Sequence, residues 1–335
     1  MREIKFNLVL PIASFNRAKT WAERADSQGF YSVSCADHMF TRTLFLNFER
    51  TPAQPQMECY TTLAAVAAVT KRVRLVPFIT PMKFRSPALL AKMLATIDQI
   101  SGGRVIAGLG AGWQREELDN YGYGFATNVE RIERLDEGIK ILKAMWTEEE
   151  PSFHGRHYTI DQAHCFPKPI QKPHPPIMMG GSGRKVLEIA AREANIMNLV
   201  AAVYQGSIGP RQQAKFDNRQ LHRKIAELHE LARAAGRDPD SIELSGFPLV
   251  LMSESKSEAD AMAKAAGDAA GIADLDEVRH LPMSLIGTPD EIKRELRYRI
   301  EEFNVTYYFL ALGSPEAVEL FSTKVMPEFT SVPAP

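Results

Sequence analysis

The chain has 335 residues, of which 45% are hydrophobic and 24% charged, with a formal net charge of −1 at pH 7. This balance excludes the strongly basic surface of a typical nucleic-acid-binding protein, and no apolar run is long enough to predict a membrane-spanning helix. Cys35, Cys59 and Cys165 form no CxxC pair, and the N-terminus lacks the layout of a signal peptide. Both features favour a reducing, cytoplasmic location.

Strand patterns alternate with helix patterns along the chain. Short apolar runs predict eight strands, at 4–12, 31–38, 73–81, 104–110, 177–180, 196–203, 242–253 and 306–313. Helices are predicted at 16–28, 59–71, 87–100, 128–146, from about 183, and at 217–235, 256–267, 289–303 and 315–329. The segment 152–160 is typical of a small hairpin centred on Gly155.

This alternation indicates an α/β fold with parallel strands joined by helical crossovers. Eight repeats around one core favour a closed (β/α)8 TIM barrel over an open doubly wound sheet. We predict a single domain over 1–335, with loop insertions near 39–58, 147–174 and 204–216. Active sites of such barrels lie at the carboxyl ends of the strands, so the candidates are the residues that end each strand.

Asp37 and His38 end the second predicted strand. A histidine can donate or accept a proton near neutral pH, and a neighbouring carboxylate can orient its ring or bind a cofactor donor. The alternative is a hydrogen-bonded core histidine beside an aspartate that caps the next segment.

A glycine-rich segment, GLGAGW, follows the fourth strand and includes Gly110, Ala111, Gly112 and Trp113. Small residues allow a flat ligand to approach the backbone, and Trp113 could form a wall of the substrate pocket. The segment lacks the third glycine of the dinucleotide fingerprint and lies in the wrong unit for it. The alternative is an ordinary turn.

A second glycine-rich segment follows the fifth strand and opens a helix. Its residues are Gly180, Gly181, Ser182, Gly183 and Arg184. Free N–H groups at a helix N-terminus, with a nearby arginine, suit a phosphate, which implies a cofactor with a phosphorylated tail. The alternative is a tight turn with a surface arginine.

The third strand carries two prolines, with Pro77 and Phe78 at its centre. Proline interrupts regular pairing, so we predict a bulge that could support a flat ring from behind. An irregular strand end is the simpler interpretation.

Two other groups of polar residues are weak candidates for a functional site. His154, His157, His164 and Cys165 match no common zinc spacing, so we predict no metal site. Glu116 and Glu117 are typical of the solvated first turn of a short helix.

Five segments carry a family resemblance. They are SCADH at 34–38, MECYTTLAAVAAVTKRVRL from 57, FRSPALLAKMLATIDQISGGRVIAGLGAGWQREELDNYG from 84, RIERLDEGIKILKAMWTEEEPSFHGRHY from 131 and PKPIQKPHPPIMMGGSGRKVLEIAAREANIMN from 167. Together they resemble the bacterial luciferase-like monooxygenase superfamily, and most closely its branch that uses the deazaflavin coenzyme F420.

The resemblance implies a (β/α)8 barrel, often as a homodimer. It implies that Asp37 and His38 lie near the deazaflavin head, that the strand-three bulge lies behind the ring, and that the glycines at 110–112 lie beside it. It also implies that segment 180–184 surrounds the phosphate-bearing tail.

Two departures concern the substrate. The sugar-phosphate dehydrogenase branch has a glutamate after the strand-four glycines and a tryptophan four residues after the histidine, whereas this chain has Trp113 and Arg42. We therefore expect a small, less polar organic substrate in a pocket formed by Trp113, Phe40 and Arg42.

The leading hypothesis is hydride transfer between coenzyme F420 and such a substrate, with His38 handling the proton. The nearest alternative is a monooxygenase that uses reduced FMN and oxygen, supplied by a separate reductase. A barrel hydrolase or lyase using Asp37, His38 and Glu116, or a non-catalytic flavin-binding protein, are the alternatives of other classes. Oxygen dependence separates the first two.

Overall fold

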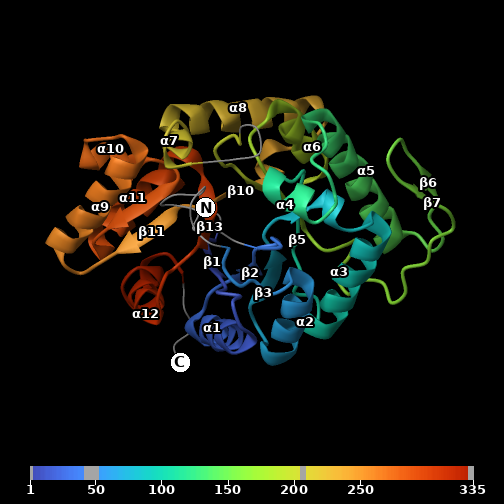
Figure 1. Cartoon of the computed structure of the whole chain (residues 1–335), viewed down its shortest axis with the longest axis horizontal. Coiled ribbons are helices and arrows are strands. Elements are labelled where there is room, and N and C mark those ends of the chain that lie inside the picture. Colours follow the sequence, from blue (N-terminus) through green and yellow to red (C-terminus); the bar gives the residue numbers. More distant parts are fainter. Residues whose placement is uncertain (1–2, 41–52, 204–208, 331–335) are drawn as a thin grey trace.

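Parallel strands form the centre of the molecule, and helices surround them (Figure 1). The computed structural model describes residues 3–40, 53–203 and 209–330. The sheet order is β3-β2-β1-β13-β10-β9-β8-β5-β4, and every neighbouring pair is parallel. Its strands are β1 (Lys5–Val9), β2 (Ser32–Cys35), β3 (Arg74–Pro77), β4 (Thr80–Pro81), β5 (Ala107–Gly110), β8 (Ile177–Gly180), β9 (Ile196–Asn198), β10 (Glu243–Gly246) and β13 (Val305–Leu310).

The sheet closes on itself through the third predicted strand, which is divided into β3 and β4. The Leu75 N–H donates to the Arg104 carbonyl at 2.9 Å, and the Ile106 N–H donates to the Leu75 carbonyl at 3.0 Å. The interruption contains the cis peptide Phe78–Ile79, at the position where a bulge was predicted. Counting β3 and β4 as one interrupted strand, the predicted (β/α)8 barrel is confirmed.

Helices follow the strands and cover the outside of the barrel. They are α1 (Phe15–Gln28), α2 (Cys59–Val69), α3 (Pro87–Ser101), α4 (Arg115–Asn120), α5 (Asn128–Thr147), α6 (Arg184–Glu193), α7 (Pro210–Gln213), α8 (Asn218–Ala234), α9 (Lys256–Ala270), α10 (Leu275–His280), α11 (Pro289–Phe303) and α12 (Pro315–Lys324), with short 3₁₀ turns η1 (Met82–Phe84), η2 (Pro239–Ser241) and η3 (Met326–Glu328). The long α5 shows why the pattern was readable: its buried residues Ile132, Leu135, Ile139 and Leu142 recur every three or four positions.

Two apolar layers hold the barrel together. The larger layer lies between strands and helices, and a smaller one fills the barrel interior. In the interior the rings of Phe78 and Phe309 stack at 4.1 Å with an interplanar angle of 9°. Burying one such side chain contributes about 1.5–3 kcal/mol to stability, so this stack stabilises the interior of the barrel.

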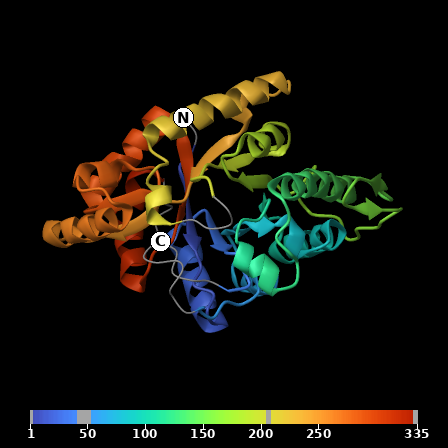
Figure 2. The ribbon, with the colours of Figure 1, turned by 45° about the horizontal axis from the view of Figure 1, so that its top comes forward.

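The seventh predicted strand, 242–253, is not one strand. It breaks before Pro248 into β10 and β11 (Leu249–Met252), and β11 pairs with an unpredicted strand, β12 (Ser284–Gly287). A proline has no N–H for the barrel ladder, which explains the break. The predicted hairpin is confirmed as β6 (Phe153–His154) and β7 (Thr159–Ile160), which project to one side of the molecule (Figure 2).

Candidate active site

One large cavity, of about 1090 Å³, lies at the carboxyl ends of the barrel strands. Its lining comes from segments that are far apart in the sequence. The residues singled out beforehand that line it are His38, Phe78, Gly110, Ala111, Gly112, Trp113, Gly180, Gly181, Ser182 and Gly183. The structure therefore brings the histidine and both glycine-rich segments to one space.

Ile79 connects the two glycine-rich segments. A Cβ added at Gly180 would lie 2.4 Å from the Ile79 Cδ1, and one at Gly110 would lie 3.0 Å from the Ile79 Cγ2. Ile79 also lines the cavity. These two glycines are thus needed because the Ile79 side chain occupies the space, a reason that the sequence did not reveal. The side chain and its two glycines form one apolar ledge, which we call the Ile79 ledge.

The Ile79 ledge makes a testable prediction. Gly180→Ala should lower the free energy of unfolding by about 1–3 kcal/mol, because the new methyl overpacks against Cδ1. Adding Ile79→Val removes that carbon, so the double variant should recover most of the loss in a urea denaturation experiment. If Ile79→Val instead adds its own loss to that of Gly180→Ala, the contact does not explain the glycine.

His38 is held by a buried carboxylate. Its Nδ1 lies 3.0 Å from the Glu117 Oε2, which also accepts the Met39 N–H at 2.9 Å. The Trp113 ring meets the imidazole edge-on at 5.7 Å. A carboxylate at Nδ1 favours the tautomer with its proton there, which leaves Nε2 for a molecule in the cavity.

Glu117 corrects one sequence expectation. The predicted short helix is present as α4, and Glu116 is exposed, but the Glu117 side chain is only 1% exposed. Its partner His38 lies 79 positions away, so no local spacing in the sequence could have indicated the pair.

Asp37 does not line the cavity among the described residues. It is 2% exposed and accepts hydrogen bonds from Arg85 at 2.7 Å (Nη1) and 3.1 Å (Nη2). Arg85 also pairs with Glu58 and lies over the Tyr60 ring at 4.4 Å. Burial alone would lower the pKa of Arg85, but its hydrogen bonds to Asp37 and the Asp37 charge outweigh burial and raise it. The structure therefore places Asp37 in a buried ion pair with Arg85, and its role at the cofactor stays a prediction.

The segment after β8 forms a cradle of backbone amides. Gly181 has φ +140°, a conformation that residues other than glycine rarely adopt. Gly183 precedes α6, and no side chain caps this helix. The first free N–H groups of a helix attract anions, and the buried Ser182 adds a hydroxyl beside them. The chemistry of this segment fits a phosphate.

Arg184 does not add its charge to that cradle. Its side chain is 67% exposed and pairs with Glu188 at 3.2 Å and Glu227 at 3.4 Å, and it is not among the cavity-lining residues. A guanidinium on the phosphate therefore stays a prediction, and the backbone N–H of Arg184 is a second candidate donor.

The remaining predicted residues are placed less centrally. Pro77 is fully buried, with its carbonyl against Gly108, and Phe40 is not among the lining residues. Arg42 lies outside the described residues. Phe125 and Phe247, which were not predicted, join Trp113 in the cavity lining.

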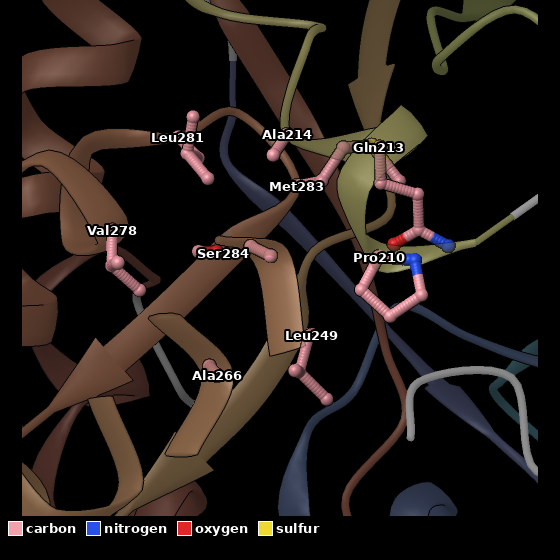
Figure 3. A pocket seen from close by; sticks show the side chains of 10 residues that line it. Pro210, Gln213, Ala214, Leu249, Ala266, Val278, Leu281, Met283 and Ser284 are labelled. Carbon is pink, nitrogen blue, oxygen red and sulfur yellow. The ribbon is translucent and has the colours of Figure 1, made fainter. Parts of the chain in front are cut away.

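A second, much smaller pocket of about 40 Å³ lies between α7, α9 and β12 (Figure 3). It shares Gln213 and Met283 with the large cavity. A pocket of this size holds a water molecule or a methyl group, so it cannot hold a cofactor.

The described ranges contain no group of three or more histidine, cysteine or acidic side chains that could hold a metal. They also contain no helix that is long and apolar enough to cross a membrane.

Comparison with known proteins gives the class. The family described as luciferase-like monooxygenase matches residues 6–318, and the chain belongs to that family. The chain is 40% identical over 140 residues to the FMNH(2)-dependent dimethylsulfone monooxygenase of Pseudomonas putida, but this match covers 42% of the chain and only 38% of that protein.

Two solved structures share the whole fold. Monooxygenase RslO1 from Streptomyces bottropensis has a TM-score of 0.72 at 26% identity, with 98% of this chain and all (100%) of that chain covered. The coenzyme F420 dependent tetrahydromethanopterin reductase from Methanopyrus kandleri has a TM-score of 0.75 at 21% identity, with 98% and 100% covered. At 21% identity, the similarity to the reductase shows a shared fold alone.

Proposed function

We propose that this protein is an oxidoreductase that holds a flavin-type cofactor, FMN or coenzyme F420, and a small organic substrate in the large cavity. The observation that carries the proposal is the meeting of His38, the Ile79 ledge and the 181–183 amides in one space of about 1090 Å³. Family membership supports the same class.

The residues fit the two ends of such a cofactor. A flat ring fits against the Ile79 ledge and the segment 110–112. Gly110 has no side chain there, and an added Cβ would lie 3.0 Å from the Ile79 Cγ2. A phosphate fits the amides that open α6. When bound, the ring supplies the electron chemistry, and the protein supplies orientation, charge and exclusion of water.

In this proposal, His38 holds or moves the proton at Nε2, and Glu117 fixes the imidazole through Nδ1. The mostly apolar lining, including Trp113 and Phe247, excludes water from the reacting atoms.

FMN is the cofactor that the comparisons favour. The two relatives described above that exceed 25% identity are both named as monooxygenases, and one is named as FMNH(2)-dependent. Coenzyme F420 is the second candidate, favoured by the motif resemblance of segments 84–122 and 167–198. With FMN, a separate reductase would supply the reduced cofactor. A homodimer is part of either proposal.

A titration tests the proposal. Purified protein is titrated with FMN, reduced FMN and coenzyme F420, and the change in cofactor fluorescence or absorbance is followed. Saturable binding of one of them is expected. Oxygenated product formed from reduced FMN, oxygen and dimethylsulfone, as a first trial substrate, only when the protein is present separates monooxygenase from hydride-transfer activity. Failure of all three to bind would contradict the proposal and favour the hydrolase or lyase alternative.

A further inference from the structure

The charged groups of the large cavity have one sign. Among the described residues that line it, the charged side chains are Arg115 and Arg131, and neither an aspartate nor a glutamate is present. A cavity lined by one sign of charge concentrates ligands of the opposite sign. The cavity is therefore built for at least one anionic group.

Arg131 is already occupied by the protein. Its guanidinium donates to the carbonyls of Gly112 at 3.1 Å and Ala126 at 2.5 Å, and to the Asn128 side chain at 3.4 Å. Burial lowers its pKa, and the charge of Arg115 lowers it further. Arg131 thus organises the wall of the cavity.

Arg115 differs from Arg131 in its contacts. In the described part of the chain it forms no hydrogen bond or ion pair. Its guanidinium lies 4.1 Å from the centre of the Phe125 ring, as that of Arg131 does. Stacking on a ring leaves the N–H edge of a guanidinium available to a carboxylate or sulfonate. Two like charges against one ring, with no acid among the described lining residues, leave a place for an anion.

The position of Arg115 points to the substrate. It begins α4, two residues after Trp113 and two before Glu117, the two residues that contact His38. The phosphate cradle lies on a different loop, at 181–183. Resting on the proposed function, we infer that the substrate is a small organic acid: its anionic group binds the Arg115 guanidinium, and its apolar body lies against Trp113.

Calorimetric titration tests this inference. The protein, saturated with the cofactor that binds, is titrated with butanesulfonate and, as the neutral counterpart, with butanol. Butanesulfonate should bind saturably and more tightly than butanol. Arg115→Gln should weaken butanesulfonate binding about five- to tenfold, a moderate effect because Arg115 is exposed to solvent. Arg115→Lys should weaken it less, because the positive charge is kept.

The controls separate the sources of anion. Arg192→Gln, at an exposed arginine of α6 outside the cavity lining, should leave butanesulfonate binding unchanged. FMN and riboflavin are titrated in parallel: if Arg115→Gln weakens FMN but not riboflavin, the charge serves the cofactor phosphate and the inference is overturned. Equal binding of butanol and butanesulfonate also overturns it. If no cofactor binds, the proposed function fails, and the same titration on the cofactor-free protein still decides the role of Arg115.

Discussion

Replacing Arg85 by methionine should lower the free energy of unfolding by about 3–5 kcal/mol, the largest stability effect that we expect from one substitution. The reason is Asp37, which is 2% exposed and receives two hydrogen bonds from Arg85. Methionine fills much of the space but leaves a buried carboxylate without its charged partner. Urea denaturation at pH 7.5 measures the loss.

The pH dependence of this loss has a definite sign. Burial raises the pKa of Asp37, and replacing Arg85 removes the positive charge that partly offsets burial. A carboxyl with a raised folded-state pKa destabilises the fold as pH rises through that value. The deficit of Arg85→Met should therefore be smaller at pH 5 than at pH 7.5.

A double variant and a surface arginine serve as controls. Asp37→Asn combined with Arg85→Met should recover a large part of the stability, because no buried charge remains. Arg184→Met, at an exposed site, should change stability by less than about 0.5 kcal/mol. An additive loss in the double variant would show that the ion pair is not the cause.

His38→Ala should lower kcat by about 100-fold or more, with the Kd of the cofactor changed by no more than about threefold. The side chain lines the cavity and is proposed to handle a proton there, whereas cofactor binding is assigned to other segments. Steady-state kinetics on the first substrate found, with cofactor titration in parallel, measures both quantities.

Glu117→Gln tests whether the carboxylate acts through His38. The amide oxygen can still accept the Met39 N–H, so the thermal midpoint should change little, while kcat should fall about tenfold and KM should stay nearly constant. His164→Ala, on an exposed histidine far along the chain, should affect neither. A loss of cofactor binding with an unchanged rate in His38→Ala would refute the assignment of His38.

The barrel could be predicted from the sequence because its helices and strands show short-range patterns. The three- and four-residue spacing of α5, the glycine after α1 with φ 86°, and the interrupted third strand all follow from short-range sequence rules. Because parallel strands end at the same side of a barrel, His38 and the glycine-rich segments could be expected to meet, and the structure places them around one cavity.

Other features depend on contacts between distant residues and could not be predicted. The His38–Glu117 pair spans 79 positions and the Asp37–Arg85 pair spans 48. Arg184 follows a cradle of amides in sequence, yet its exposed side chain pairs with acidic residues on α6 and α8. The strand β12 was missed because it pairs outside the barrel, after Pro248 has ended the ladder.

A crystal structure of the protein with its tighter-binding cofactor, FMN or coenzyme F420, tests the central claim most directly. The account predicts the ring against Ile79 with His38 nearby, and the phosphate on the amides of 181–184. A cofactor bound elsewhere, or with its phosphate at another strand end, would contradict it.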